Sequence, residues 1–315
     1  MRGAAGGVML RSCTGGAFPL AMRRLQMSKE IRTILAAVDR NDGQAKRVAA
    51  KAVSLAHMTG AHVELFLSDS EAAFNLQHQY EAGTAARAKE ASLVDSRRYL
   101  ETLRRRLVPS EVGISLSVAC ESPLYEAIVH AAERSRADLV VRGAAPGEPL
   151  DPNTWELVAE CPAPLLLTRG RPWHAPPAIA AAIDVSPGES QELTRAILHT
   201  AAGLARMVGG RVEVVHAAGI ESAVQADIAA RRTALDERVR NAGLEGVEAH
   251  VLAGEPARAL REFGAERGFD LIVLGALTHR KALAALVGTL TGQLIESLET
   301  DFLLVKPRSA RMNVP

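Results

Sequence analysis

The sequence predicts an α/β protein made of two tandem domains, each with a five-stranded parallel sheet of the Rossmann-like kind. Short apolar runs alternate with amphipathic helical segments along the chain, which is the order of right-handed βαβ crossovers. The same succession occurs twice, in residues 31–169 (the first half) and in residues 178–307 (the second half). The length of 315 residues is enough for two ordinary domains.

The composition excludes several classes of protein. Hydrophobic residues make up 48% of the chain and only 3% is aromatic, so a full core is expected, built mainly of Ala, Val, Leu and Ile. The net charge of +1 gives no strong field for a polyanion, and no stable nucleic-acid partner is expected. Three cysteines far apart in sequence fit a reducing, cytoplasmic location rather than a disulfide framework. No apolar run approaches the roughly 18 residues of a membrane span, so no membrane partner is expected.

Residues 1–30 are predicted to be a flexible N-terminal extension outside the fold. Residues 1–28 contain four arginines and no acidic residue. An organellar transit peptide is the alternative, because such peptides are Arg-rich and poor in acid. Met22 and Met27 both precede the first strand-like run, which also fits an upstream start codon.

The first half opens with a strand at 31–39, an apolar run that ends in Asp39 as a buried parallel strand does. A helix with Val48, Ala52 and Leu55 on one face follows, and Gly60 is placed where a helix would end. The later elements are a second strand after Gly60, an irregular surface loop or gate at 74–80 with the loop favoured, a helix at 84–107, a third strand at 114–119, a helix from Pro123, a fourth strand at 138–143, a last helix and a last strand at 164–168.

The second half repeats this order. Residues 205–214 match residues 56–65 without a gap, and Gly209 takes the place of Gly60. The elements are a strand at 178–184 that ends in Asp184, a helix up to Gly209, a second strand, a helix at 224–241, a strand at 247–252, a helix from Pro256, a strand at 270–275, a helix at 289–298 and a last strand at 302–306. Residues 170–177 form a linker with three prolines, and residues 308–315 form a tail.

The two halves are expected to form an intramolecular pseudo-dimer. Their last strands are short and apolar, and an exposed apolar edge strand invites pairing. We expect an antiparallel contact between 164–168 and 302–306, related by a pseudo-two-fold axis. A further homodimer is compatible with this arrangement.

Residues 270–291 resemble the signature of the universal stress protein family, which is Gly, two residues, Gly, nine residues, Gly and then Ser or Thr. Gly275, Gly288 and Thr289 fall on this pattern, and Thr278 replaces its second glycine. The repeat, the linker and residues 150–164 are similar to the tandem, E-type members. The resemblance implies an adenine nucleotide alpha hydrolase-like fold for each half. It also implies a cytoplasmic stress-response module for binding or signalling, with an adenine nucleotide in the second half.

The ligand is expected beyond the carboxyl ends of the strands, where the strand order of an open parallel sheet reverses. Asp184 ends the first strand of the second half, and Gly275 ends the fourth. Free N–H groups at the start of the last helix, with the hydroxyls of Thr289 and Thr291, suit a phosphate. The alternative is a closed loop in which Thr289 only caps the helix.

The resemblance assigns roles to the residues of this site. Asp184 accepts from the adenine or ribose, and Ala182 and Leu274 line the base pocket. The ribose and phosphates are held by Gly275, Thr278, Gly288, Thr289, Leu290 and Thr291. ATP, with Mg²⁺, is the candidate cofactor.

The first half is expected to have a degenerate ligand loop. After Gly143 it carries Glu148 and Asp151, which repel phosphate, and three prolines, which lack N–H donors. No Gly-Thr pair remains there. Trp155 is interpreted as a core anchor for the short last helix.

No catalytic and no metal-binding residue is assigned. His57 and His62 span a helix end, which is poor ligand geometry, and Cys120 is interpreted as a small core residue. Only His279 offers a general base beside the glycine loop, so a binding protein is favoured over an enzyme. Two alternatives stay open: a slow adenine-nucleotide hydrolase or phosphotransferase, and a binder of an acyl chain or lipid precursor.

Overall fold

The computed structural model describes residues 30–40, 43–79, 82–107, 111–219, 225–276 and 290–307. The first half consists of β1 (Thr33–Ala37), α1 (Ala45–Thr59), β2 (His62–Ser68), α2 (Ser70–Gln79), α3 (Ala82–Arg106), β3 (Ile114–Ala119), α4 (Leu124–Ser135), β4 (Leu139–Gly143), α5 (Pro152–Glu160) and β5 (Leu165–Thr168). The second half consists of β6 (Ala178–Ala182), α6 (Gln191–Val208), β7 (Arg211–Ala217), α7 (Gln225–Asn241), β8 (Glu248–Leu252), α8 (Pro256–Arg267), β9 (Leu271–Gly275), α10 (Leu290–Ser297) and β10 (Asp301–Val305).

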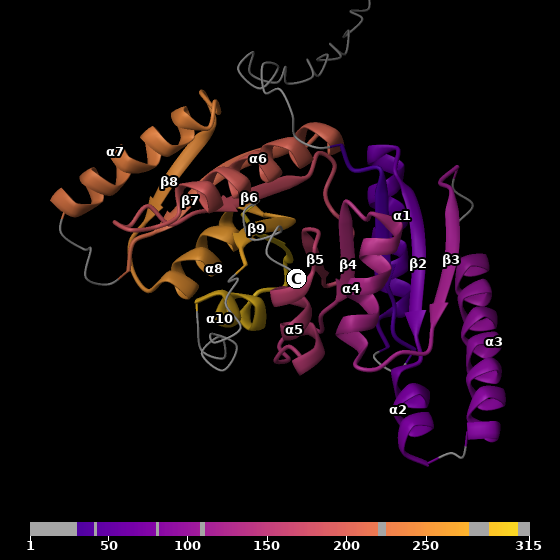
Figure 1. Ribbon diagram of the computed structural model, residues 1–315. Coiled ribbons are helices and arrows are strands. Elements are labelled where there is room, and N and C mark those ends of the chain that lie inside the picture. Colours follow the sequence, from indigo (N-terminus) through magenta and orange to yellow (C-terminus); the bar gives the residue numbers. More distant parts are fainter. Residues whose placement is uncertain are drawn as a thin grey trace, which may run out of the picture.

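All of these strands form one ten-stranded sheet, in the order β3-β2-β1-β4-β5-β10-β9-β6-β7-β8 (Figure 1). Within each half the strands are parallel, and the first strand lies beside the fourth. The strand order therefore reverses between β1 and β4, and again between β6 and β9, as the sequence predicted. The α/β fold class is confirmed.

The two halves meet through their last strands. β5 and β10 are antiparallel neighbours, with Leu166 paired to Leu303 at the centre of the contact. Antiparallel pairing of corresponding strands is the arrangement that a two-fold axis through the sheet produces, so the predicted pseudo-dimer is confirmed. Because of this axis, the carboxyl ends of the strands point in opposite directions in the two halves.

Helices cover both faces of the sheet, and the apolar side chains of its strands point alternately to two cores. One core contains residues of α1, α3, α6 and α7, including Leu55, Leu100, Ile197 and Leu235. The other contains residues of α4, α5, α8 and α10, including Ile128, Leu157, Leu260 and Leu294. Each core runs continuously across both halves. Aliphatic residues dominate both, as the composition predicted. Trp155 and Cys120 are buried, as expected of core residues.

Helix ends follow the predicted glycine signals. Gly60 adopts a left-handed conformation with φ of 74° and donates its N–H to the carbonyl of Ala56. Gly209 does the same with φ of 65°, donating to Ala205. A β-carbon disfavours this conformation, which explains why the same residue occurs at both helix ends.

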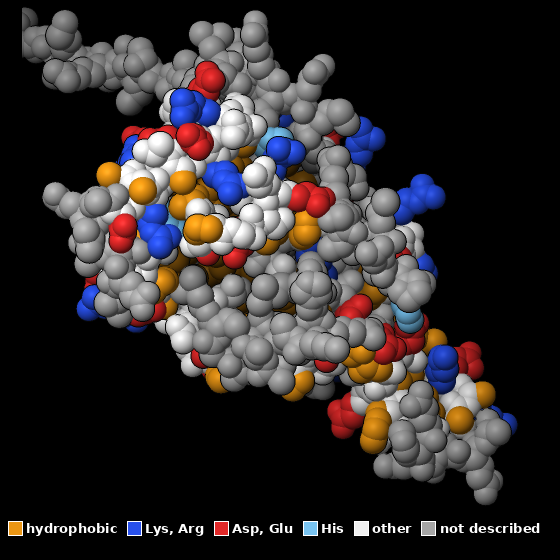
Figure 2. Space-filling view, turned by 60° about the vertical axis from the view of Figure 1, so that its left-hand side comes forward, with side chains coloured by type: hydrophobic (Ala, Val, Ile, Leu, Met, Phe, Trp, Pro, Cys, Tyr) orange, Lys and Arg blue, Asp and Glu red, His pale blue; other side chains and the backbone are white. Residues whose placement is uncertain are grey.

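The prediction of a loop at 74–80 is wrong, because residues up to Gln79 belong to α2. Asp69, directly before this helix, accepts a hydrogen bond from the N–H of Ala72 at 3.0 Å. Its other carboxylate oxygen accepts from the Ser92 hydroxyl of α3 at 2.9 Å. The helix therefore starts at a carboxylate cap that also ties it to α3. The α2–α3 pair projects from the body (Figure 1), and Phe74 and Val94 on it are 53% exposed. Hydrophobic side chains are visible on this projection in Figure 2.

The junction between the halves contains matched cations from both sides. Arg169 follows β5 and donates to the carbonyls of Ala145 and Ile295, the latter in α10. Lys306 occupies the corresponding position after β10 and donates to the carbonyls of Ala159 and Cys161, at the end of α5. Each half thus places a cation at carbonyl groups of the other half's last helix, where the helix dipole favours positive charge.

Within the described residues, no helix is long and apolar enough to cross a membrane.

Candidate functional site

The candidate site lies at the carboxyl ends of β6 and β9. These strands are neighbours, with Ala181 paired to Val273. Ala182 is the last residue of β6, and Leu274 and Gly275 are the last two residues of β9. The side chain of Asp184, two residues beyond β6, is 51% exposed. The described part of the predicted site therefore gathers where the strand order reverses.

Asp184 is held in place by its own turn. Its Oδ1 accepts a hydrogen bond from the N–H of Ser186 at 2.8 Å. This local contact fixes the backbone of the turn and leaves acceptor capacity on the carboxylate, since each oxygen can take more than one donor.

Gly275 packs closely against the side chain of Leu193 in α6. A β-carbon at this position would lie 2.7 Å from Cδ2 of Leu193. The corresponding glycine of the first half, Gly143, would place a β-carbon 2.7 Å from Cβ of Gln44. In both halves the glycine at the end of the fourth strand therefore lies close to the start of the helix that follows the first strand, a packing role that the sequence analysis did not predict.

The remaining predicted residues are only partly described. Thr278, Gly288 and Thr289 lie outside the described residues, as does His279. Leu290 opens α10, and only its backbone is described. Thr291 lies in the first turn of α10 and is half-buried.

Sequence reasoning missed a histidine and an arginine beside Asp184. His216 of β7 lies with Nδ1 at 3.2 Å from the carbonyl oxygen of Ile183, and with Nε2 at 3.2 Å from a guanidinium nitrogen of Arg231. These partners imply that Nδ1–H donates and Nε2 accepts. Nδ1 also lies 3.8 Å from Oδ1 of Asp184. The sequence signal that marks His216 is a polar residue directly after the apolar pair Val214 and Val215 of the strand.

The environment of His216 keeps its imidazole neutral. Burial is the largest cause that lowers the pKa of His216, and the charge of Arg231 lowers it as well. The Ile183 carbonyl and the Asp184 carboxylate act in the opposite direction but do not offset the burial. Arg231 also donates to the hydroxyl of Ser186 at 3.3 Å. The carboxyl end of β6 thus carries hydrogen-bond donors and acceptors in fixed positions, and the carboxylate of Asp184 is open to solvent.

The lowered pKa of His216 predicts a loss of stability in acid. The native state takes up this proton less readily than the unfolded chain does, so stability present above about pH 6.5 is lost as the pH falls towards the native pKa. We expect His216→Gln to make the melting temperature less sensitive to pH between about pH 7.5 and pH 5.5. Thermal melts of both forms across this range test the expectation. An equally steep fall in the two proteins would contradict it.

The first half fills the corresponding place with its own side chains. Asp39 corresponds to Asp184, and its carboxylate lies 3.5 Å from Arg142. Arg142 is buried and takes the position of Leu274. At the start of α5, Asp151 accepts from the N–H of Thr154 at 3.1 Å and from its hydroxyl at 2.5 Å. In the first half, Arg142 therefore places a cation at the strand end, and Asp151 places an anion at the start of α5.

A cavity of about 510 Å³ lies elsewhere, at the amino ends of β9 and β10. It is lined by the linker residues Trp173 and His174, by Arg261 of α8 and by Phe269, among others. Parallel sheets bind ligands at the carboxyl ends of their strands, so this cavity is separate from the candidate site.

Comparison with known proteins identifies the family. The family model described as "Universal stress protein family" matches residues 30–169 and 178–306, one match for each half. The chain therefore belongs to the universal stress protein family and carries two tandem domains of it.

Two relatives are similar to this chain over more than half of its length. The chain is 26% identical over 223 residues to the universal stress protein E homolog of Haemophilus influenzae, covering 62% of this chain and 71% of that protein. It is 20% identical over 281 residues to universal stress protein E of Escherichia coli K12, covering 82% and 88%.

A solved structure that covers most of this chain shows the same fold. A functionally unknown protein from Pseudomonas aeruginosa PAO1 covers 93% of this chain and 96% of its own, with a TM-score of 0.64 and 23% identity. A universal stress protein from Archaeoglobus fulgidus, solved in complex with dAMP, covers 41% of this chain and 97% of its own, with 23% identity and a TM-score of 0.31. The dAMP is bound in the structure of that relative.

Proposed function

We propose that this universal stress protein is a stress-response binding module that holds one adenine nucleotide, ATP, in its second half and none in its first. The observation that carries the proposal is the difference between the two strand ends. Asp39 in the first half faces the buried Arg142, whereas Leu274 takes that position in the second half. The first carboxylate is therefore neutralised internally, and Asp184 keeps its charge available to a ligand.

The base and ribose would lie against β6 and β9. The partly buried Ala182 and the buried Leu274 are the apolar residues at the switch point, and the half-exposed Asp184 offers an acceptor for amino or hydroxyl donors. A mixture of apolar lining with a few fixed polar groups is typical of sites for small ligands.

The phosphates would lie at the start of α10. The first N–H groups of a helix have no partner within the helix and attract anions. Thr291 adds a hydroxyl in the first turn of α10. In the first half this place is taken by the carboxylate of Asp151, which already accepts the N–H of Thr154. The assignment of Thr278, Gly288, Thr289 and Leu290 to the ribose and phosphates rests on the family signature. Mg²⁺ would arrive on the phosphates and keep most of its water ligands.

A binding role is proposed in place of catalysis. The histidine beside Asp184 is buried, and both its ring nitrogens are engaged, with Ile183 and Arg231. A general base must reach the proton that it abstracts, and His216 is not free to do so. The cytoplasmic location is supported by Cys120 and Cys161, which are buried thiols that form no disulfide within the described residues.

The ligand that accompanies the purified full-length chain tests this function. The protein would be denatured after purification without added nucleotide, and the released small molecules would be identified by mass spectrometry. We expect an adenine nucleotide with its phosphates intact. An acyl compound or lipid precursor in its place would overturn the proposal. Steady release of inorganic phosphate from added ATP would replace the binding module with a hydrolase.

A further inference from the structure

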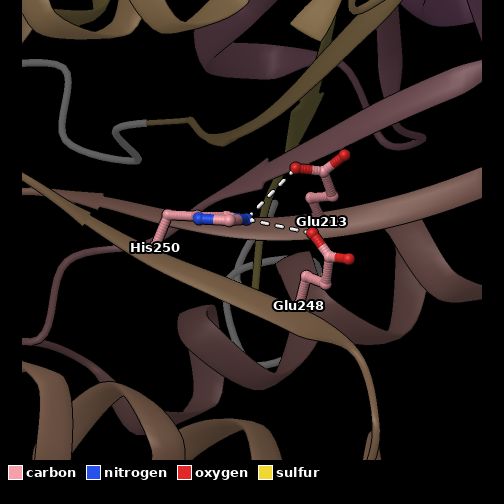
Figure 3. Close-up of side chains that lie close together, drawn as sticks. All are labelled: Glu213, Glu248 and His250. Carbon is pink, nitrogen blue, oxygen red and sulfur yellow. Dashed lines mark ion pairs between the residues drawn. The ribbon is translucent and has the colours of Figure 1, made fainter.

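Three side chains from two neighbouring strands, Glu213, Glu248 and His250, point toward one another (Figure 3). They lie outside the candidate nucleotide site. Glu213 of β7 and Glu248 of β8 are direct partners in the strand register. His250 lies two residues after Glu248, so its side chain points to the same face of the sheet. Its Nε2 is 3.2 Å from Glu213 Oε2 and 3.6 Å from Glu248 Oε2. The ligand-type atoms of all three residues lie within 4.8 Å of one another.

Two of these atoms are buried without hydrogen bonds. Glu213 is 3% exposed, and neither its Oε2 nor the His250 Nε2 has a hydrogen-bond partner within the described part of the chain. Buried polar atoms normally have hydrogen-bond partners, whereas these two lie 3.2 Å apart as an ion pair without forming a hydrogen bond, and this calls for an explanation. The ring of His250 is also held in position, because it packs against Phe263 with the ring centroids 4.9 Å apart.

The distances from His250 to the two carboxylates suit a small tetrahedral metal ion. At metal–ligand distances of about 2.0–2.2 Å, two ligands of a tetrahedral ion are about 3.3–3.6 Å apart. The separations of 3.2 and 3.6 Å agree with this value. One imidazole nitrogen and two carboxylate oxygens are typical ligands of zinc, and three protein ligands leave a fourth position for water. Mg²⁺ and Ca²⁺ prefer six or more oxygen ligands.

Two arginines currently balance the charge of the carboxylates. Arg211 pairs with Glu213 through Oε1, the oxygen that faces away from His250. Arg267 lies 3.6 Å from Glu213 Oε2 and 3.5 Å from Glu248 Oε2. Arg267 is the last residue of α8 and its side chain is 35% exposed, so it can turn into solvent. A divalent ion would replace its charge between the same two oxygens.

We propose that Glu213, Glu248 and His250 bind one divalent transition-metal ion, best matched by Zn²⁺, which displaces Arg267 from the two carboxylates. The site ties β7 to β8 at the outer edge of the second half. It is independent of the proposed nucleotide site, because it lies towards the amino ends of these strands.

Calorimetric titration of the full-length, untagged chain with zinc chloride tests the site. We expect one saturable Zn²⁺ per chain, unaffected by an equal concentration of Mg²⁺. Glu248→Gln and His250→Gln should each weaken this binding by at least about tenfold, since each removes a ligand. Arg267→Gln should strengthen it, because the competing cation is removed. Glu245→Gln, an exposed carboxylate three residues before Glu248, is the matched control and should leave the affinity unchanged.

The outcomes separate a metal site from an ion-pair network. No saturable binding, or equal affinity in the wild type and both ligand variants, would overturn the proposal and leave the cluster as a bridge between strands. Circular dichroism melts show whether each variant is folded at the titration temperature. If Glu248→Gln or His250→Gln is unfolded at the titration temperature, the titration of Arg267→Gln tests the proposal instead. An unchanged or weaker zinc affinity in Arg267→Gln would overturn the proposed site.

Discussion

Replacing Asp301 by asparagine is expected to lower the free energy of unfolding by about 3–5 kcal/mol, since breaking a buried ion pair leaves an uncompensated charge. Asp301 is 2% exposed, and its carboxylate lies 2.8 Å from Nζ of Lys51, which is 6% exposed. Burial already lowers the pKa of Lys51, and Asp301 is the main group that acts in the opposite direction. Asparagine keeps an acceptor at this position but removes the charge that balances Lys51.

The same carboxylate also joins the two halves and the linker. It accepts from the hydroxyl of Thr168 at 3.1 Å, from the N–H of Arg169 at 2.7 Å and from the indole of Trp173 at 2.8 Å. Lys51 comes from α1 of the first half, whereas Asp301 opens β10 of the second half. The substitution therefore weakens the junction itself, and this is why we expect a large effect.

Thermal melts measure the loss at Asp301. A change of about 3 kcal/mol corresponds to roughly 6–12 °C in melting temperature for domains of this size. Glu299→Gln is the matched control, because Glu299 pairs with Arg171 at an exposed position and should contribute less than about 1 kcal/mol. Lys51→Met should cost less in the Asp301→Asn background than alone. Asp301→Asn with a melting temperature within about 2 °C of the wild type would contradict the account.

Asp184→Ala is expected to weaken ATP binding by about ten- to a hundred-fold, whereas Asp39→Ala should leave it unchanged. A hydrogen bond to a charged group contributes about 1.5–3 kcal/mol, which corresponds to that range of affinity. The two aspartates occupy the same position in their halves, so each is the control for the other. They differ in their neighbours, because Asp39 faces the buried Arg142, whereas Leu274 takes the position of Arg142 in the half that contains Asp184.

Calorimetric titration of the three proteins with ATP checks this prediction. Melting temperatures should show that both variants are folded at the titration temperature. Asp39→Ala is expected to melt lower than Asp184→Ala, because it removes the carboxylate beside the buried Arg142, whereas Asp184 is half-exposed. An equal loss of affinity in the two variants would mean that both halves bind nucleotide. A loss confined to Asp39→Ala would place the site in the first half.

Most of the fold followed from the sequence because its signals are local. The fourth strands end in glycine in both halves, and both first helices end at glycines in the left-handed conformation. The antiparallel contact of β5 and β10 followed from their short apolar runs. The helix at Ser70–Gln79 was missed because its sequence has little apolar periodicity. Its start depends instead on Asp69 and on contact with α3.

Within the candidate site, the sequence predicted positions only for residues at a strand end. Gly275 ends β9 and Asp184 lies two residues beyond β6, close to the positions expected from the sequence. His216 and Arg231 were missed because they reach the site from β7 and α7, and sequence spacing does not show such contacts. The pair of Lys51 and Asp301 joins residues that are 250 positions apart. Glu213 and His250 meet through the register of two strands, which periodicity alone does not fix.

The number of ATP molecules bound per chain at saturation tests the central claim most directly. Titration of the wild-type, full-length protein should give one nucleotide per chain, because Arg142 and Asp151 occupy the corresponding places in the first half. Two nucleotides per chain would show that these side chains do not close the first site. The absence of any binding would show that the open strand end of Asp184 serves a different ligand.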